Sequence, residues 1–154
     1  MTTTVDSKQD QLSISEIITQ AVYNTPTPDV PPYAAILSIV KEGTLPNCEV
    51  KQYGNTVFIT HFSEDKDLAV GRALNIDTAQ NFIYNGEDYI RDLVKGGTRK
   101  FVAQFQQASF ARALMLFKKK PITTKMRMFM YKTSDGGVQV RIALDGDLIE
   151  ERKQ

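Results

Sequence analysis

The chain has 154 residues, 42% of them hydrophobic and 24% charged, which suits one globular domain and excludes wholesale disorder. Its 19 basic and 18 acidic side chains leave a formal net charge of +1. Cys48 is the only cysteine, which excludes an internal disulfide and a Cys-rich zinc site. The sequence has neither a secretory signal nor an apolar run of about 18 residues, so we expect a cytoplasmic protein without a membrane segment.

The N-terminal part is predicted to hold a leader, two helices and a connector. Residues 1–11 are almost entirely polar, which predicts a flexible leader before a single domain over residues 12–154. Apolar residues at helical spacing predict a first helix over residues 12–23. Four prolines in residues 25–32 predict an extended connector, and a second helix is expected over residues 33–42, before Gly43.

A change to a period of two follows at Cys48 and predicts an antiparallel meander. Strands are expected over residues 48–53 and 56–62, joined by a turn at Gly54 and Asn55, and over residues 68–76. The Asn85-Gly86 turn signal favours a further strand over residues 80–84. A short helix is then predicted over residues 87–95.

The C-terminal part is predicted to contain the longest helix, over residues 98–120, and a hairpin over residues 125–144. The helix is rich in Phe and apolar on several sides, so sheet, other helices or a second subunit would have to cover it. The fold class predicted is therefore α+β: an antiparallel sheet of about five strands against one long Phe-rich helix, with two shorter N-terminal helices.

The register of the hairpin is predicted from its side chains. A three-residue turn at 135–137 would pair Met130 with Ile142 and Met128 with Leu144, and gather the methionines on one core face. The opposite face interleaves cations and aromatic rings. Its predicted members are Lys125, Arg127, Phe129, Tyr131, Gln139 and Arg141.

This outer hairpin face is predicted to bind nucleic acid, because single strands place phosphates on Lys and Arg and stack bases on Phe or Tyr. Phe129 and Tyr131 would stack bases, while Lys125, Arg127 and Arg141 would supply charge. Two alternatives stay open. Helices could cover this face, or Tyr131 and Arg141 could form only a stabilising cross-strand pair.

The charge distribution supports an anionic partner. Residues 93–134 contain ten of the basic side chains and no acidic one, so this stretch is near +10 and the rest of the chain near −9. Arg99 and Lys100, at the predicted start of the long helix, could bind a phosphate, or could be compensated by acidic side chains of the preceding helix. Lys118, Lys119 and Lys120 at its end could help to bind, or could simply complement the helix dipole.

No strong catalytic or metal motif is present, and we predict no enzyme, no cofactor and no metal. His61, the only histidine, lies in a predicted strand, where a structural role is favoured over that of a base. Its sequence neighbours Glu64, Asp65 and Asp67 could be partners but are crowded into a turn. Cys48 is expected to be a small buried residue.

The leading hypothesis is a small non-enzymatic nucleic-acid-binding accessory protein that prefers single strands. The alternative is a protein-interaction or assembly subunit, either a homo-oligomer or an inhibitor-type binder, whose basic half meets an acidic protein surface. A third hypothesis is a hydrolase built around His61 and nearby carboxylates.

Overall fold

The computed structural model describes residues 11–105, 111–112, 115 and 119–150. Nearly all of the predicted leader and Lys118 lie outside these residues. Within them, no helix is long and apolar enough to cross a membrane. The elements are the helices α2 (Ile14–Asn24), α3 (Pro32–Glu42) and α4 (Ala79–Lys95) and the strands β1 (Cys48–Tyr53), β2 (Thr56–Phe62), β3 (Leu68–Asn75), β4 (Lys100–Phe105), β5 (Thr123–Lys132) and β6 (Val138–Leu148).

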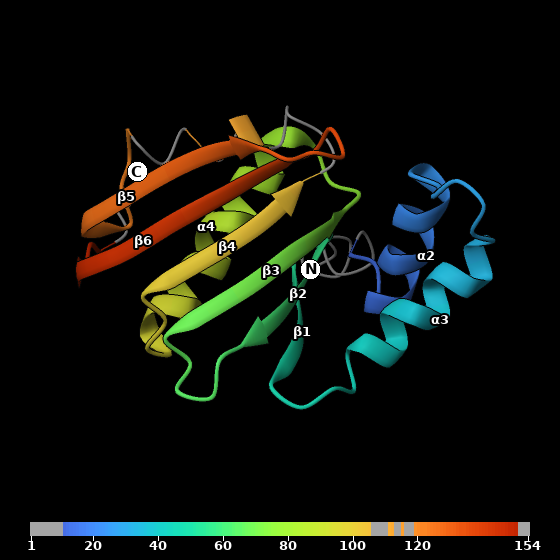
Figure 1. Cartoon of the computed structure of the whole chain (residues 1–154), viewed down its shortest axis with the longest axis horizontal. Helices are drawn as coiled ribbons and strands as arrows, with labels where there is room; N and C mark the ends of the chain where they lie inside the picture. Colours follow the sequence, from blue (N-terminus) through green and yellow to red (C-terminus); the bar gives the residue numbers. More distant parts are fainter. Residues whose placement is uncertain (1–10, 106–110, 113–114, 116–118, 151–154) are drawn as a thin grey trace, which may run out of the picture.

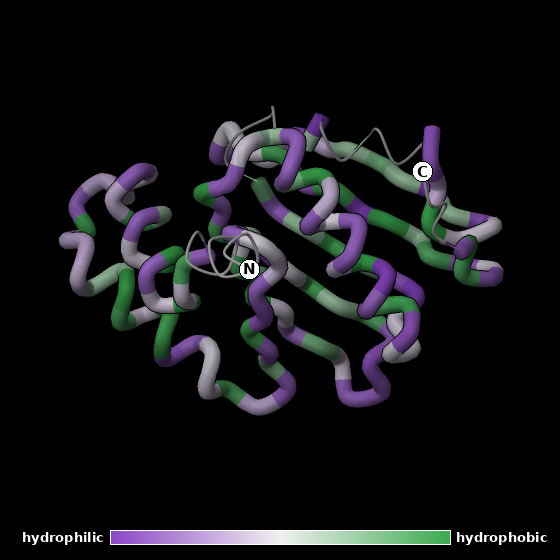
Figure 2. The backbone as a smooth tube through the Cα atoms, turned by 180° about the vertical axis from the view of Figure 1, so that it is seen from behind, coloured by the Kyte–Doolittle hydropathy of each residue, from purple (hydrophilic) through white to green (hydrophobic). Residues whose placement is uncertain are grey.

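The six strands form one mixed sheet in the order β1-β2-β3-β4-β6-β5. Every neighbouring pair is antiparallel except β3 and β4, which run parallel and are connected through α4. Helix α4 lies behind the sheet in Figure 1 and in front of it in Figure 2. Its buried residues recur every three or four positions, as a helix that packs with one face requires. They are Phe82, Gly86, Tyr89, Ile90, Leu93 and Val94.

The parallel strands β3 and β4 diverge toward their carboxyl ends. They pair only from Leu68 to Gly71 and from Lys100 to Ala103. Beyond these residues β3 continues to pair with β2, and β4 with β6. Ligands of open sheets tend to bind outside the carboxyl ends of such strands, so this divergence marks a region to search for function.

The other face of the sheet is covered only in part. Helices α2 and α3 pack there against β2 and β3, in a second core cluster that includes Ile17, Ile39, Val57 and Ile59. The start of α2 is a capping box, in which Ser13 accepts the Glu16 N–H and the Glu16 carboxylate accepts the Ser13 N–H. The two predicted N-terminal helices are therefore present, with bounds shifted by one or two residues.

The predicted sheet of about five antiparallel strands against one long Phe-rich helix is wrong. Residues 100–105, expected to begin that helix, form the central strand β4, in which Phe101, Ala103 and Phe105 are buried in alternation. Burial at every second residue is the period of a strand and not of a helix. On this face of the sheet the helix that packs is α4.

The predicted strand over residues 80–84 is also wrong, because α4 already begins at Ala79. Thr78 caps the helix by accepting the Asn81 N–H at 3.1 Å. Asn85 and Gly86 form no turn: Gly86 is buried, and the Asn85 amide donates to Thr56 Oγ1 at 3.0 Å. Tertiary contacts thus override a local turn signal.

The hairpin has the predicted faces but not the predicted register. Met130 pairs with Val140 and Met128 with Ile142, two residues from the expected partners, because the connection spans residues 133–137. A shift of two residues leaves every side chain on its face. Met128, Val140, Ile142 and Leu144 are accordingly buried, although Met130 is exposed. The division into a leader, one domain and a connector over residues 25–32 stays a prediction.

Candidate functional site

A cluster of charged side chains lies on the face of the sheet that α2 and α3 partly cover. Glu42, the last residue of α3, accepts a hydrogen bond from His61 Nε2 on β2 at 2.5 Å. Its other carboxylate oxygen accepts a hydrogen bond from Arg72 on β3. The His61 side chain is 40% exposed, so a ligand can reach it. The cluster therefore joins an accessible imidazole to a carboxylate that an arginine holds in place.

The Glu42 carboxylate stays charged over the neutral range. Partial burial works to raise its pKa, but the hydrogen bond from His61 and the charge of Arg72 prevail and lower it. A charged carboxylate accepts hydrogen bonds only. In the neutral tautomer of the imidazole the proton consequently lies on Nε2, and the lone pair lies on Nδ1.

Cys48 borders the same cluster but does not complete a nucleophilic triad. Its Sγ lies 4.0 Å from His61 Nε2, the nitrogen that already donates to Glu42. A triad needs one ring nitrogen for the nucleophile and the other for the carboxylate. Burial and the negative charge of Glu42 also raise the pKa of the Cys48 thiol, which disfavours the reactive thiolate.

The predicted nucleic-acid-binding residues are only partly brought together. Lys125, Arg127, Phe129, Tyr131 and Arg141 are all exposed on one face of the β5–β6 hairpin, as predicted. The open alternative of a covering helix is thereby excluded for the described residues. Their role in binding stays a prediction.

No helix begins at Arg99 and Lys100, so the predicted helix start that would hold a phosphate there is absent. Whether these two side chains bind an anion stays a prediction. The Arg99 guanidinium instead donates to the carbonyls of Val94, at 3.4 Å, and Thr98, at 3.1 Å, just beyond the end of α4. A cation at a helix C-terminus interacts favourably with the helix dipole, whereas at the predicted helix start the same interaction would have been unfavourable. Lys100 lies on β4, 4.0 Å from Asp67. Lys119 and Lys120 are exposed, outside any helix or strand.

The amino terminus of α4, beside the diverging strands, carries an anion of its own. The Asp77 carboxylate accepts the backbone N–H groups of Asn55 at 3.1 Å and Thr78 at 3.2 Å. It also accepts the side-chain amides of Asn81 at 2.9 Å and Asn85 at 3.1 Å. Burial works to raise the pKa of Asp77, but these hydrogen bonds lower it. The helix start is therefore no free phosphate site.

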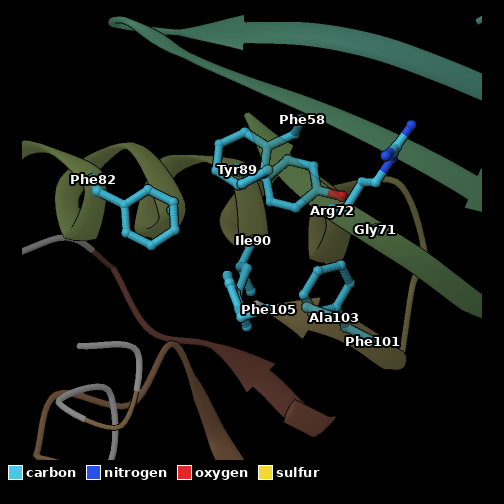
Figure 3. Close-up of a pocket in the computed structure, with 11 residues that line it drawn as sticks. Phe58, Gly71, Arg72, Phe82, Tyr89, Ile90, Phe101, Ala103 and Phe105 are labelled. Atoms are coloured by element: carbon cyan, nitrogen blue, oxygen red, sulfur yellow. The ribbon is translucent and has the colours of Figure 1, made fainter. Parts of the chain in front are cut away.

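A small apolar cavity lies where β3 and β4 diverge (Figure 3). Aromatic rings from the sheet and α4 surround it, while the Arg72 side chain points away. Its volume is about 10 Å³, room for one water molecule at most. The rings that line it are those of Phe58, Phe82, Tyr89, Phe101 and Phe105. This region is core packing and holds no ligand-sized space.

A larger polar pocket of about 220 Å³ lies between β1, β2 and the end of α4. Its polar groups are bonded to one another: Tyr53 donates to Asp92 at 2.5 Å, and the hydroxyls of Tyr89 and Thr60 share a hydrogen bond. Burial chiefly raises the pKa of both tyrosines, so both hydroxyls stay protonated at neutral pH. The pocket offers hydrogen bonds but no imidazole.

Sequence reasoning singled out His61 but missed its partner. Glu42 lies 19 residues upstream at the end of a helix, whereas Glu64, Asp65 and Asp67 were the carboxylates considered. Asp65 instead accepts the hydroxyl of Ser63 at 2.8 Å within its own turn. Among the described residues, no three His, Cys, Asp or Glu side chains gather as a metal site would require. No local sequence pattern predicts that the end of a helix will contact a particular strand of the sheet.

Comparison with known proteins gives few matches. No family model matches the chain, and none of the curated proteins does. A solved structure, the ribosomal-protein-S18-alanine N-acetyltransferase from Escherichia coli, is similar to it with 17% identity and a TM-score of 0.49, over 94% of this chain and 96% of that chain. At these values the similarity assigns no activity or residue to the present chain.

We correct our prediction of a non-enzymatic, nucleic-acid-binding accessory protein, and its alternative of an assembly subunit. Both predictions drew on a long helix from residue 98, but residues 100–105 form strand β4. Arg99 lies at the end of α4 instead of at a helix start. Both hypotheses are withdrawn as the function of this chain.

Proposed function

We propose that this chain is an enzyme that transfers an acyl group to an amine, with His61 as the general base and Glu42 as its positioning residue. The observation that carries the proposal is the 2.5 Å hydrogen bond from His61 Nε2 to Glu42, on an imidazole that solvent still reaches. A histidine with one nitrogen bonded to a carboxylate has its other nitrogen directed to accept a proton.

The proposed step uses the free lone pair of His61 Nδ1. The amine nitrogen attacks the carbonyl carbon of the acyl donor, and the new C–N bond forms as the bond from that carbon to the leaving group breaks. The proton lost by the amine passes to Nδ1 and then to the leaving group. Glu42 stabilises the imidazolium that forms in between, and Arg72 keeps Glu42 in position.

A direct transfer fits this site better than a covalent intermediate. Cys48 is the only cysteine, and the pKa of its thiol is raised. Its Sγ lies near His61 Nε2, the nitrogen that already donates to Glu42, so His61 cannot take the thiol proton through that nitrogen. The filled helix start at Asp77 also means that a donor with phosphate groups would have to place them elsewhere. A cytoplasmic location stays a prediction from the sequence.

The transfer can be tested with a peptide that has a free α-amino group and one lysine. p-Nitrophenyl acetate and, as a phosphate-bearing donor, acetyl-coenzyme A are the two acyl donors, and mass spectrometry detects the acetylated peptide. We expect acetylation above the rate without protein from at least one donor, lost in His61→Ala and kept in Lys41→Ala, an exposed neighbour of Glu42. Absence of product with both donors would refute the proposal.

A further inference from the structure

One face of the sheet carries no helix of the described residues over β4, β6 and β5. Helix α4 packs on the opposite face, and α2 and α3 reach only as far as β2 and β3 (Figure 1). Aromatic and aliphatic side chains remain in solvent there: Phe129 and Tyr131 are each 48% exposed and Val70 is 44% exposed. Exposed apolar side chains that gather on one face mark an interaction site.

The strand register places these side chains in a row. Val70 pairs with Val102, Val102 with Arg141, and Arg141 with Phe129, so the four lie side by side across β3, β4, β6 and β5. His61 pairs with Val70 and extends the row to the proposed base. Four strand spacings of about 4.8 Å give a row of about 19 Å, which an extended segment of about six residues spans.

Cations flank this row. Lys100 and Arg127 lie in the next row, both opposite Ala143, and Lys125 lies farther along β5. Asp145 faces Arg127 at 3.4 Å, but both side chains are more than half exposed, so the pair is weak. Four basic side chains, with Asp145 beside Arg127 and Asp67 4.0 Å from Lys100, leave the face with a net positive charge.

The arrangement of Arg141 favours carboxylates over bases as ligands. Its guanidinium lies 5.1 Å from the centre of the Tyr131 ring and thus covers one face of that ring. Its Nε donates to Gln139 Oε1 at 2.7 Å, which fixes the group. The terminal nitrogens remain for a carboxylate, which arginine binds in a bidentate manner. A nucleic-acid base, in contrast, could stack on the face of the Tyr131 ring that Arg141 covers only by displacing Arg141.

We propose that this face, defined by Val70, Val102, Phe129, Tyr131, Arg127 and Arg141, binds an extended acidic polypeptide segment that also carries apolar side chains. Valines and the Phe129 ring contact the apolar side chains, while the arginines pair with Asp or Glu. The face leads to His61, so the segment is a candidate to present the amine. The binding itself rests on the face alone and does not require the proposed acyl transfer.

Binding can be measured by fluorescence anisotropy with a labelled peptide of alternating Glu and Leu at low salt. We expect affinity to fall about tenfold or more in Phe129→Ala and in Arg141→Ala, since aromatic and arginine side chains dominate such contacts. Lys95→Ala removes an exposed cation at the end of α4 and should change nothing. Because Phe129 and Arg141 are exposed, circular dichroism should show both variants folded.

The proposal would be overturned by no peptide binding at high micromolar protein, by peptide binding that both variants retain, or by tighter binding of an oligothymidylate of equal charge. Self-association that the same variants abolish, measured by light scattering, would assign the face to a second copy and equally overturn it. The peptide assay needs no acyl donor. Loss of acyl transfer in His61→Ala with intact peptide binding would therefore separate this proposal from the proposed function.

Discussion

The packing between the diverging strands makes Gly71→Ala the sharpest test of the fold. A Cβ at Gly71 would lie 2.7 Å from the Tyr89 hydroxyl and 2.9 Å from Phe101 Cε1, both closer than van der Waals contact. Both rings belong to the buried core, so neither can move freely. Such overpacking destabilises proteins by about 1 to 3 kcal/mol. At about 2 to 4 °C per kcal/mol for a chain of this size, Tm should fall by about 2 to 12 °C.

Thermal unfolding followed by circular dichroism measures this effect, with Gly96→Ala as the matched control. A Cβ at Gly96 would lie 3.5 Å from the nearest atom, an ordinary contact, so this variant should keep the wild-type Tm within about 2 °C. In a Tyr89→Phe background the closest contact is absent, so Gly71→Ala should cost less stability there than it costs in the wild type. A Gly71→Ala variant as stable as the wild type would refute the described packing of α4 on β3.

Two further predictions concern carboxylates with lowered pKa values. Asp77→Asn should destabilise by about 1 to 3 kcal/mol, because an amide can accept only about half of the four hydrogen bonds and each contributes about 0.5 to 1.5 kcal/mol. Urea unfolding should show this difference at pH 7, and it should shrink as the pH falls below about 3.9, the unfolded value. Glu42→Gln should likewise be less stable than the wild type at pH 7, with the gap closing below about pH 4.3 since the folded pKa is depressed. A gap that widens in acid would contradict either assignment.

Local patterns predicted the first half of the sheet well. The strands Cys48–Tyr53 and Thr56–Phe62 have the predicted bounds, because side chains alternate and Gly54 adopts the positive φ of +56° that a tight turn needs. Residues 100–105 were misread because Phe and Val occur in both kinds of element. Whether such a segment is helix or strand depends on its neighbours in the sheet, which the sequence does not display.

The candidate site was predictable only in part. His61 stood out as the single histidine, and the outer hairpin face followed from alternation along two strands. The partner of His61 depends on where α3 ends relative to β2, and that position is set by the packing of Ile39 against Val57 and Ile59. Pairings of this kind arise from tertiary structure, which no spacing along the chain encodes.

The rate of acyl transfer at pH 7 by wild type, His61→Ala and Glu42→Gln tests the central claim most directly. We predict that His61→Ala lowers the rate by about 10² to 10⁴, because the general base is lost. Glu42→Gln should keep part of the rate, because the amide oxygen can still accept the Nε2 proton but a neutral amide does not stabilise the imidazolium. A His61→Ala or Glu42→Gln rate equal to that of the wild type would contradict the account.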